Sequence, residues 1–221
     1  MKYQTFVIKA ILRQNLWFVL PYLLLLLGSS IYLSMNGKGA MVLLLDTHAQ
    51  KTLDWFFVFY THLGDGLFAL FTVLLFLFIN KKQALTLAIG LILSGLLAQL
   101  LKHTIGIEHH RPSLFFEGIH SFRDIEYLVR HLHHSMPSGH TASAFCLFFT
   151  LALMSEKKTY GYLFFCMALL VGISRMYLAQ HFLEDVVAGS FLGTMVALFV
   201  YTMANKWFSN AKWNKPLIPV Q

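Results

Sequence analysis

Long apolar runs limit what this chain can fold into more than any other feature of its sequence. Six runs approach the ~20 residues that a helix needs to cross a bilayer, namely Leu16–Met35, Leu63–Ile79, Ala84–Leu101, Gly139–Met154, Tyr160–Ile173 and Phe182–Met203. Apolar residues fill 57% of the 221 positions and charged residues only 12%, whereas a soluble domain averages about 25% charged residues. One core of this size cannot hide so much apolar surface. Without linkers or repeats, the sequence predicts an all-α fold: a polytopic membrane bundle of about six transmembrane helices, forming one domain over residues 1–221.

Basic residues between the runs predict how the bundle is oriented. They gather near the N-terminus, at Lys81–Lys82, at Lys157–Lys158 and in the C-terminal tail, all on one side of the predicted membrane. The positive-inside rule makes that side cytoplasmic. We therefore expect both termini in the cytoplasm and the polar clusters on the outer face. The first run is too long for a signal peptide, so we interpret it as a retained anchor.

The formal charge of +7 does not indicate a nucleic-acid partner, because the basic residues form no continuous stripe. Cys146 and Cys166 both lie within apolar runs, where cysteine behaves as a small hydrophobic residue. In the long outer loop, Ser121–His134 carries apolar residues at helical spacing and Ser121 as a cap candidate. We expect a helix there, lying in the membrane interface. Its role is open between bordering a substrate entrance and purely structural packing.

The segment ISRMYLAQHFLEDVVAG, residues 173–189, places ionisable residues among apolar ones. His181 and Asp185 are four positions apart, so we expect them on one face of the helix that begins the last run. The carboxylate then accepts a proton from one imidazole nitrogen and leaves the other as a free nucleophile. Arg175 lies six positions before His181 and can reach the same centre. Ionisable groups near a bilayer are costly and mark function.

A second polar cluster, SMPSGHTAS, directly precedes the fourth run. It places Ser138 and Gly139 in the first turn of a helix, where unpaired N–H groups and the helix dipole suit an anion such as phosphate. Gly139 allows a ligand close to the backbone, and His140 projects from the same turn.

The third cluster, KHTIGIEHHRPS, follows the third run and offers Lys102 and Arg111 as ligands for the oxygens of an anion. For Lys102 the alternative is interfacial snorkelling. The three clusters together supply a nucleophile, an orienting acid, a second histidine and three cations beside a helix N-terminus. This set matches phosphoryl transfer through a covalent phosphohistidine.

The chain resembles the type 2 phosphatidic acid phosphatase (PAP2) superfamily, whose membrane members are lipid phosphatases and whose signatures are K-x6-R-P, P-S-G-H and S-R-x5-H-x3-D. The second is present as Pro137–His140 and the third as Ser174–Asp185. The resemblance implies a metal-independent reaction without a cofactor. His181 attacks phosphorus and His140 acts as general acid, then as base. Further site residues are implied by the resemblance: Asp185 to fix the tautomer of His181, and Lys102, Arg111, Arg175 and the amides of Ser138 and Gly139 to bind the phosphate.

The first signature departs from the family pattern, because eight residues separate Lys102 from Arg111–Pro112. On a continuous helix, two extra residues would turn the lysine by about 200°. We expect the helix to open at Gly106 and a bulge to absorb the insertion, with Arg111 the firmer phosphate ligand.

Two other functions stay open. One is a metal-dependent membrane hydrolase using histidines of the outer loop, which are His103, His109, His110, His120, His131, His133 and His134. They lack the usual carboxylate–histidine spacing of zinc enzymes. The other is a transporter. The charged residues argue against it, because they cluster at one surface rather than at the midplane of the membrane.

The expected substrate is a membrane lipid phosphate held at headgroup depth, reached from the lipid bilayer. Undecaprenyl pyrophosphate, phosphatidylglycerol phosphate and lipid A phosphate, all handled by similar bacterial proteins, are the candidates. We expect an integral protein of a bacterial inner membrane with its active site on the periplasmic face. The sequence does not choose among the three lipids.

Overall fold

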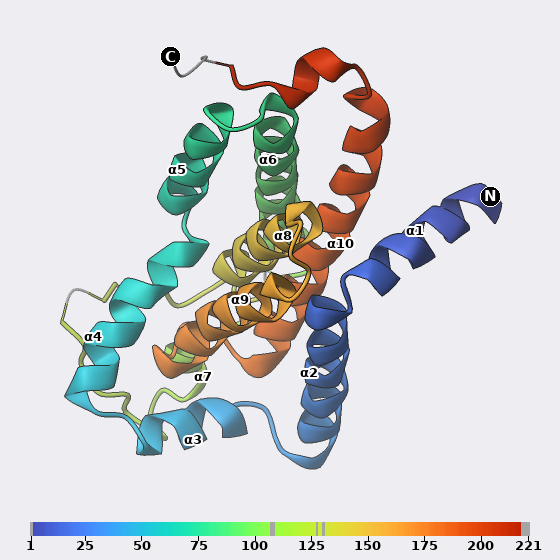
Figure 1. Cartoon of the computed structure of the whole chain (residues 1–221). Helices are drawn as coiled ribbons and strands as arrows, with labels where there is room; N and C mark the ends of the chain where they lie inside the picture. The colour runs from blue at the N-terminus through green and yellow to red at the C-terminus, as the bar shows by residue number, and fades with distance from the viewer. Residues whose placement is uncertain (1, 107–108, 127, 130, 218–221) are drawn as a thin grey trace.

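The computed structural model describes residues 2–106, 109–126, 128–129 and 131–217, and these fold into helices without any strand (Figure 1). The α-helices are α1 (Lys2–Gln14), α2 (Leu16–Met35), α3 (Ala40–Thr47), α4 (Lys51–Tyr60), α5 (Gly66–Leu77), α6 (Lys81–Thr104), α7 (Pro112–Phe115), α8 (Gly139–Met154), α9 (Tyr160–Tyr177) and α10 (Leu183–Trp207). Two short 3-10 helices are η1 (Thr61–Gly64) and η2 (Ala211–Asn214). The all-α class predicted from the sequence is confirmed.

Four helices within the described residues are long and apolar enough to cross a membrane: α2, α6, α9 and α10. The predicted bounds of the first and fourth runs coincide with α2 and α8, although α8 has only 16 residues. The second predicted run, Leu63–Ile79, covers only the second half of a bent pair, in which Lys51–Gly64 meets α5 at 54°. The length and composition of these helices thus indicate an integral membrane protein. The count of six spans stays a prediction.

The outward faces of the long helices agree with a lipid environment. Large apolar side chains stand exposed along α2, α5 and α6, among them Leu23, Leu27, Leu70, Phe71, Ile92 and Leu96. Such a continuous apolar exterior is unusual for a soluble monomer. The surplus of apolar residues in the sequence therefore lies on the outside of the bundle.

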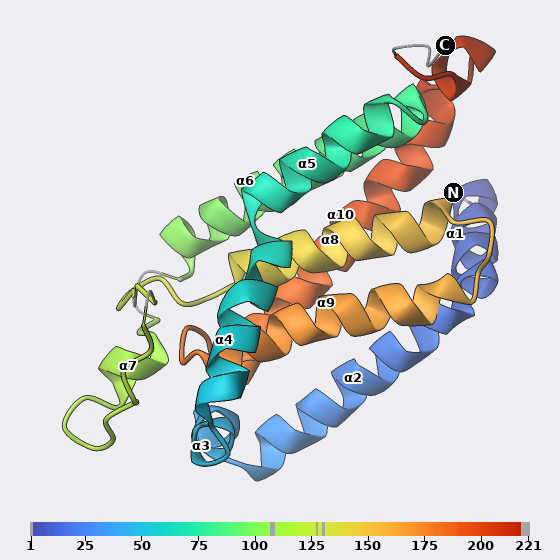
Figure 2. The same cartoon turned by 60° about the vertical axis from the view of Figure 1, so that its left-hand side comes forward.

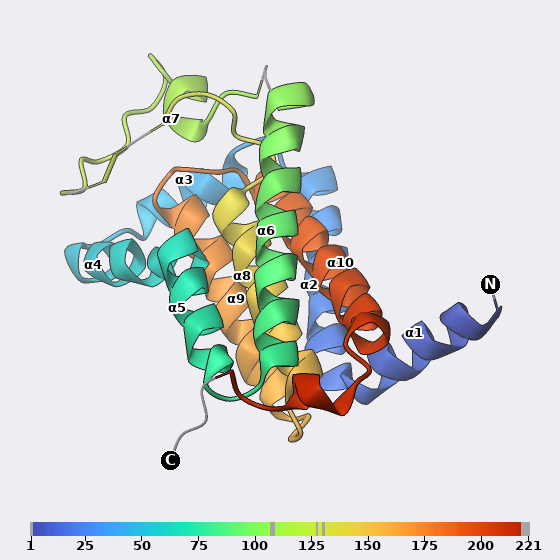
Figure 3. The ribbon, with the colours of Figure 1, turned by 90° about the horizontal axis from the view of Figure 1, so that it is seen from above.

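Helix α8 lies at the centre of the bundle and packs against α6, α9 and α10 (Figure 3). Its side chains Phe145 and Phe149 form the core together with Phe18 of α2 and Phe165 of α9. On α10, a side chain at Gly193 would lie 2.9 Å from the backbone nitrogen of Cys146. A glycine there lets the two backbones approach closely, as small residues do between membrane helices.

The two ends of the bundle differ in kind. Both termini lie at one end, where the backbone N–H of Lys81 donates to the carbonyl of Lys215 at 3.1 Å (Figure 2). Helices α3, α4 and α7 lie at the opposite end, as do the first turn of α8 and the last turn of α9 (Figure 2). The three polar clusters of the sequence therefore meet at the end away from the termini. The presence of interfacial helices on the outer face stays a prediction.

The helix predicted over Ser121–His134 is wrong for its described residues, which form no helix, and residues 127 and 130 lie outside the described part of the chain. The carbonyls of this segment serve other partners: His133 accepts from Nε of Arg111 at 3.0 Å, and Val129 accepts from Nε2 of Gln180 at 3.3 Å. In a helix over these residues, the carbonyl of Val129 would instead accept from the N–H of His133. The predicted apolar face is also divided, since Phe122 is buried while Val129 is 75% exposed.

Candidate active site

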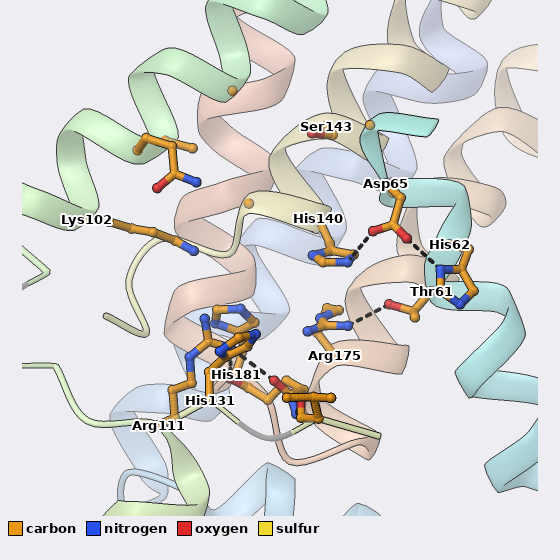
Figure 4. Close-up of a pocket in the computed structure, with 18 of the residues that line it drawn as sticks. Thr61, His62, Asp65, Lys102, Arg111, His131, His140, Ser143, Arg175 and His181 are labelled. Atoms are coloured by element: carbon orange, nitrogen blue, oxygen red, sulfur yellow. Dashed lines mark hydrogen bonds and ion pairs between the residues drawn. The ribbon is translucent and has the colours of Figure 1, made fainter. Parts of the chain in front are cut away.

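A cavity of about 470 Å³ opens at the end of the bundle away from the termini. Its walls come from the α4–α5 bend, α6, α8, the end of α9 and the outer loop (Figure 4). Six of the residues predicted from the sequence line it: Lys102, Arg111, Gly139, His140, Arg175 and His181. The two other predicted residues, Ser138 and Asp185, are completely buried behind this wall.

His181 stands in a short loop between α9 and α10 rather than on a helix face, which corrects the expectation from the four-residue spacing. The carbonyl of Arg175 accepts the backbone N–H groups of Gln180 and His181 at 2.9 and 3.2 Å. Ala179 adopts a positive φ of 50°, which reverses the chain tightly. The five residues between Arg175 and His181 thus form one tight turn, which brings the imidazole of His181 back toward Arg175.

Asp185 lies behind His181 and faces its Nδ1 at 3.4 Å, which is longer than a good hydrogen bond. Oxygen Oδ2 of Asp185 accepts the hydroxyl of Ser135 at 2.5 Å and the backbone N–H of Phe182 at 2.8 Å. Ser135 is itself fully buried and lies 3.5 Å from the same Nδ1. Ser135 was not among the predicted site residues, although it stands two positions before the Pro137 of the P-S-G-H motif.

The surroundings of His181 hold its imidazole neutral. Complete burial is the main reason why its pKa lies well below the ordinary value, and the neighbouring positive charges of Arg111, Arg175 and Lys102 lower it further. Burial and the same three cations also lower the pKa of His131, which lines the cavity from the outer loop. The cavity is therefore a strongly positive site, suited to an anion.

The two arginines are held by neutral oxygen atoms rather than by carboxylates. Arg111 donates from Nη1 to the carbonyl and the side-chain oxygen of Gln180 at 3.2 and 3.1 Å. Arg175 donates from Nη1 to the hydroxyl of Thr61 at 2.8 Å, and its Nε has no partner among the described residues. Neither guanidinium has its charge neutralised by a direct ion pair with a described carboxylate, so both remain available to an anion.

Lys102 points into the cavity from the end of α6, with its Nζ 3.9 Å from the position that a side chain at Gly139 would take (Figure 4). Helix α6 ends at Thr104, just before Gly106, as the irregular first motif predicted. The chain then returns to Arg111, whose N–H donates to the carbonyl of Leu132 at 2.9 Å. The bulge itself was predicted over Gly106–His110, and residues 107–108 of that segment lie outside the described part.

Ser138 has a different role from the one expected. Its backbone N–H donates to the carbonyl of Asp185 at 3.0 Å, so that amide is not free for a phosphate. Its hydroxyl oxygen accepts from the N–H of Thr141 at 3.4 Å and from the Thr141 hydroxyl at 2.9 Å, which caps α8. Gly139 begins α8 and lines the cavity, so its amide keeps the orientation expected of an anion site.

Asp65 was missed by the sequence analysis. It stands at the bend between η1 and α5, and its Oδ1 lies 2.5 Å from Nε2 of His140 (Figure 4). Its other oxygen lies 2.5 Å from Nδ1 of His62. One signal was present: Asp65 is the only charged residue in the predicted run Leu63–Ile79, and a carboxylate inside an apolar span is a candidate for function.

The histidines of the outer loop do not converge. His103 packs near His134 and His110 near His133, with ring centroids 5.2 and 5.6 Å apart. Within the described ranges, no group of three or more His, Cys, Asp or Glu side chains is placed to hold a metal ion.

Fold and site together define a helical membrane protein with a positively charged cavity bordered by two histidine–carboxylate pairs. The chain belongs to the PAP2 superfamily, whose sequence profile matches residues 83–209. It is 33% identical over 116 residues to the bacitracin transport permease protein BcrC of Bacillus licheniformis, a match covering 52% of this chain and 54% of that protein. The chain spans about half the length of the curated relatives that it matches first.

Two crystal structures share the fold. That of Aquifex aeolicus LpxE is 30% identical with a TM-score of 0.62, over 73% of this chain and 92% of that one. That of a PAP2-type phosphatidylglycerolphosphate phosphatase from Bacillus subtilis is 25% identical with a TM-score of 0.63, over 87% of this chain and 96% of that one.

Proposed function

We propose that this protein is a metal-independent lipid phosphatase that hydrolyses a phosphomonoester or pyrophosphate of a membrane lipid through a phosphohistidine. One observation carries the proposal: the buried, neutral imidazole of His181 borders a cavity that Lys102, Arg111 and Arg175 also line. A neutral imidazole is a nucleophile, and three cations can bind and neutralise the phosphoryl oxygens.

In the first half-reaction Nε2 of His181 attacks phosphorus, because Nδ1 faces Asp185 and Ser135. The new P–N bond forms as the bond from phosphorus to the leaving oxygen breaks. His140 gives its proton to that oxygen. Lys102, Arg111, Arg175 and the Gly139 amide stabilise the charge spread over the equatorial oxygens.

In the second half-reaction water attacks the phosphohistidine. His140, now neutral, takes a proton from the water as the new P–O bond forms and the P–N bond breaks. Inorganic phosphate leaves, His181 returns to the neutral state and His140 to the imidazolium. Asp185, held by Ser135 and the amide of Phe182, keeps the imidazole of His181 in one tautomer.

The substrate we propose is undecaprenyl pyrophosphate, phosphatidylglycerol phosphate or lipid A phosphate. The phosphatidylglycerolphosphate phosphatase of similar fold supports this class. Basic residues at the opposite end of the bundle support a cytoplasmic location for both termini, which puts the cavity at the periplasmic face of a bacterial inner membrane. An impermeant thiol reagent tests this topology on a Ser121→Cys variant with Cys146 and Cys166 replaced, since labelling of intact cells is expected only when residue 121 is outside.

The deciding experiment measures phosphate release by the detergent-purified protein from each of the three lipids, with and without a chelator. We expect release from at least one lipid, unchanged by the chelator and abolished in His181→Ala. Loss of activity in the chelator would instead favour the metal-dependent hydrolase. No release from any lipid, together with lipid or solute transport by reconstituted vesicles, would favour the transporter.

A further inference from the structure

The carboxylate of Asp65 joins two histidines at the edge of the cavity. Oδ1 pairs with Nε2 of His140 and Oδ2 with Nδ1 of His62, both at 2.5 Å (Figure 4). His140 and Asp65 are 32% and 27% exposed, whereas His62 is 62% exposed. All three side chains line the cavity, and His62 is the most exposed of them.

A purely structural role for Asp65 fits the contacts poorly. The residue precedes α5 as its N-cap, the place where an aspartate normally accepts backbone N–H groups of the first turn. Here the side chain makes no such bond. The carboxylate is directed to the imidazoles instead, so the local fold gives up a cap worth ~1 kcal/mol to make this contact.

The chain is also shaped to bring Asp65 against α8. A side chain added at Gly64 would lie 2.7 Å from the carbonyl oxygen of His140 and 2.9 Å from Cγ1 of Val171. Only a glycine permits the bend to approach the first turn of α8 this closely. The contact between Asp65 and His140 therefore depends on backbone geometry as well as on the two side chains.

We propose that Asp65 is the positioning residue of His140: it fixes the imidazole so that Nδ1 faces the leaving oxygen, and it stabilises the imidazolium that donates the proton. This inference rests on the proposed role of His140 as general acid and base. A carboxylate bonded to one ring nitrogen sets the tautomer and orientation of a histidine.

The need for such a partner follows from the charges around His140. Burial is the main factor that disfavours a positive charge on His140, and Arg175 on α9 and Lys102 on α6 disfavour it further. The imidazole of His181 is a further neighbour. Asp65, with His62 on its far oxygen, is the one carboxylate among the described residues in direct contact with His140. Without it, the imidazolium needed for the first half-reaction would be poorly populated.

The test compares Asp65→Asn, His140→Ala and the double variant in single turnovers on a lipid phosphate and on p-nitrophenyl phosphate. The nitrophenolate leaves without protonation, so the first half-reaction on that substrate needs no general acid. We expect Asp65→Asn to slow lipid phosphate turnover about 10- to 100-fold, within the roughly 10²–10⁴-fold range of general acid–base catalysis. The formation of the phosphoenzyme from p-nitrophenyl phosphate should fall less than threefold.

Two further readouts separate positioning from folding. The alkaline limb of kcat/KM should move to lower pH in Asp65→Asn, because loss of the carboxylate makes the imidazolium easier to deprotonate. In the His140→Ala background, Asp65→Asn should add less than a twofold loss. Asp46→Asn is the matched control, since Asp46 pairs with His120 at 2.9 Å at the same end of the bundle and lies outside the cavity wall. It should change activity less than twofold.

Asp65→Glu keeps the charge and replaces the asparagine variant in the test if that variant does not purify as a monodisperse protein. Asp65→Glu should retain more activity on lipid phosphate than Asp65→Ala. Equal losses on both substrates, or an undiminished loss in the His140→Ala background, would overturn the inference. A fully active His140→Ala enzyme would instead overturn the proposed role of His140 and leave the account without its general acid.

Discussion

The two histidine–carboxylate pairs of the cavity differ in nearly every physical respect. His181 and Asp185 are 1% and 0% exposed and stand 3.4 Å apart. His140 and Asp65 are 32% and 27% exposed and stand 2.5 Å apart. Burial and nearby cations disfavour the charged imidazole in both pairs, but in the second pair a close carboxylate opposes them.

This difference assigns the two chemical tasks. A nucleophile must keep a lone pair, which a dry and positively charged environment protects. A general acid must carry a proton and exchange it with water, which suits the more open pair. In the proposed reaction, similar residue types therefore perform opposite roles because their surroundings differ, as in other enzymes with paired titratable groups.

The largest effect is expected from removing either imidazole. His181→Ala should abolish phosphate release by several orders of magnitude, since the covalent route disappears. His140→Ala should be nearly as severe on a lipid substrate. Steady-state phosphate release by monodisperse protein measures both, and near-normal turnover by His181→Ala would contradict the assignment of the nucleophile.

A smaller but still large effect is expected for Arg111→Lys. The guanidinium is oriented by Gln180 and by the carbonyl of His133, and a point charge cannot reproduce its fork. We expect a loss of about 100-fold in kcat/KM, on the order of an oxyanion-hole donor. Lys51→Arg, on α4 outside the cavity wall, is the matched control for a basic residue at the same end. Normal kinetics of Arg111→Lys would show that charge alone is needed.

Ser135→Ala should sharpen the comparison by loosening only the buried pair. It removes the 2.5 Å hydrogen bond to Asp185 and leaves the His140–Asp65 pair intact. We expect kcat on lipid phosphate to fall about tenfold, near the lower end of the roughly 1.5–3 kcal/mol of a hydrogen bond to a charged group. The alkaline limb of the pH profile, assigned to His140, should not move. A shift of that limb would mean that the two pairs are not independent.

The smallest effect is a pH dependence of stability that belongs to His181. Its pKa is depressed in the folded state, so the unfolded chain binds a proton at a higher pH than the folded chain does. Stability is therefore complete above about pH 6.5 and decreases by up to about 1.4 kcal/mol for each pH unit below it. Thermal unfolding in detergent should show a smaller drop in Tm between pH 7.5 and pH 5 for His181→Gln than for the unmodified protein. Equal drops in Tm for the two proteins would show that the surroundings of His181 tolerate a charged imidazole.

Much of this architecture could be predicted from the sequence because it depends on local pattern. The apolar runs define the bounds of α2 and α8 to the residue, and Pro137 with Ser138 marks the start of α8. The third motif brings Arg175 and His181 together through a single tight turn, so its residues stay close in sequence and in space. Arg175 and His181 both line the cavity for this reason.

The errors arise where distant segments decide the outcome. The apolar spacing of Ser121–His134 predicted a helix, yet Gln180 takes the carbonyl of Val129, which a helix would need for its own hydrogen bonding. The amide of Ser138 is used by the carbonyl of Asp185, which no local pattern reveals. Asp65 stands 75 positions before His140, and only the packing of the α4–α5 bend against α8 joins them.

The central claim is that His181 carries the phosphoryl group during turnover, and rapid-quench peptide mapping by mass spectrometry tests it most directly. The unmodified protein and His140→Ala are mixed with p-nitrophenyl phosphate, quenched under alkaline conditions that preserve phosphohistidine, and digested. We expect a phosphoryl group on the peptide that contains His181, and none in His181→Ala. The phosphorylated peptide should be more abundant in His140→Ala, because water is no longer activated in that variant. Phosphate release without any phosphoryl group on His181, or with the label on another residue, would contradict the central claim.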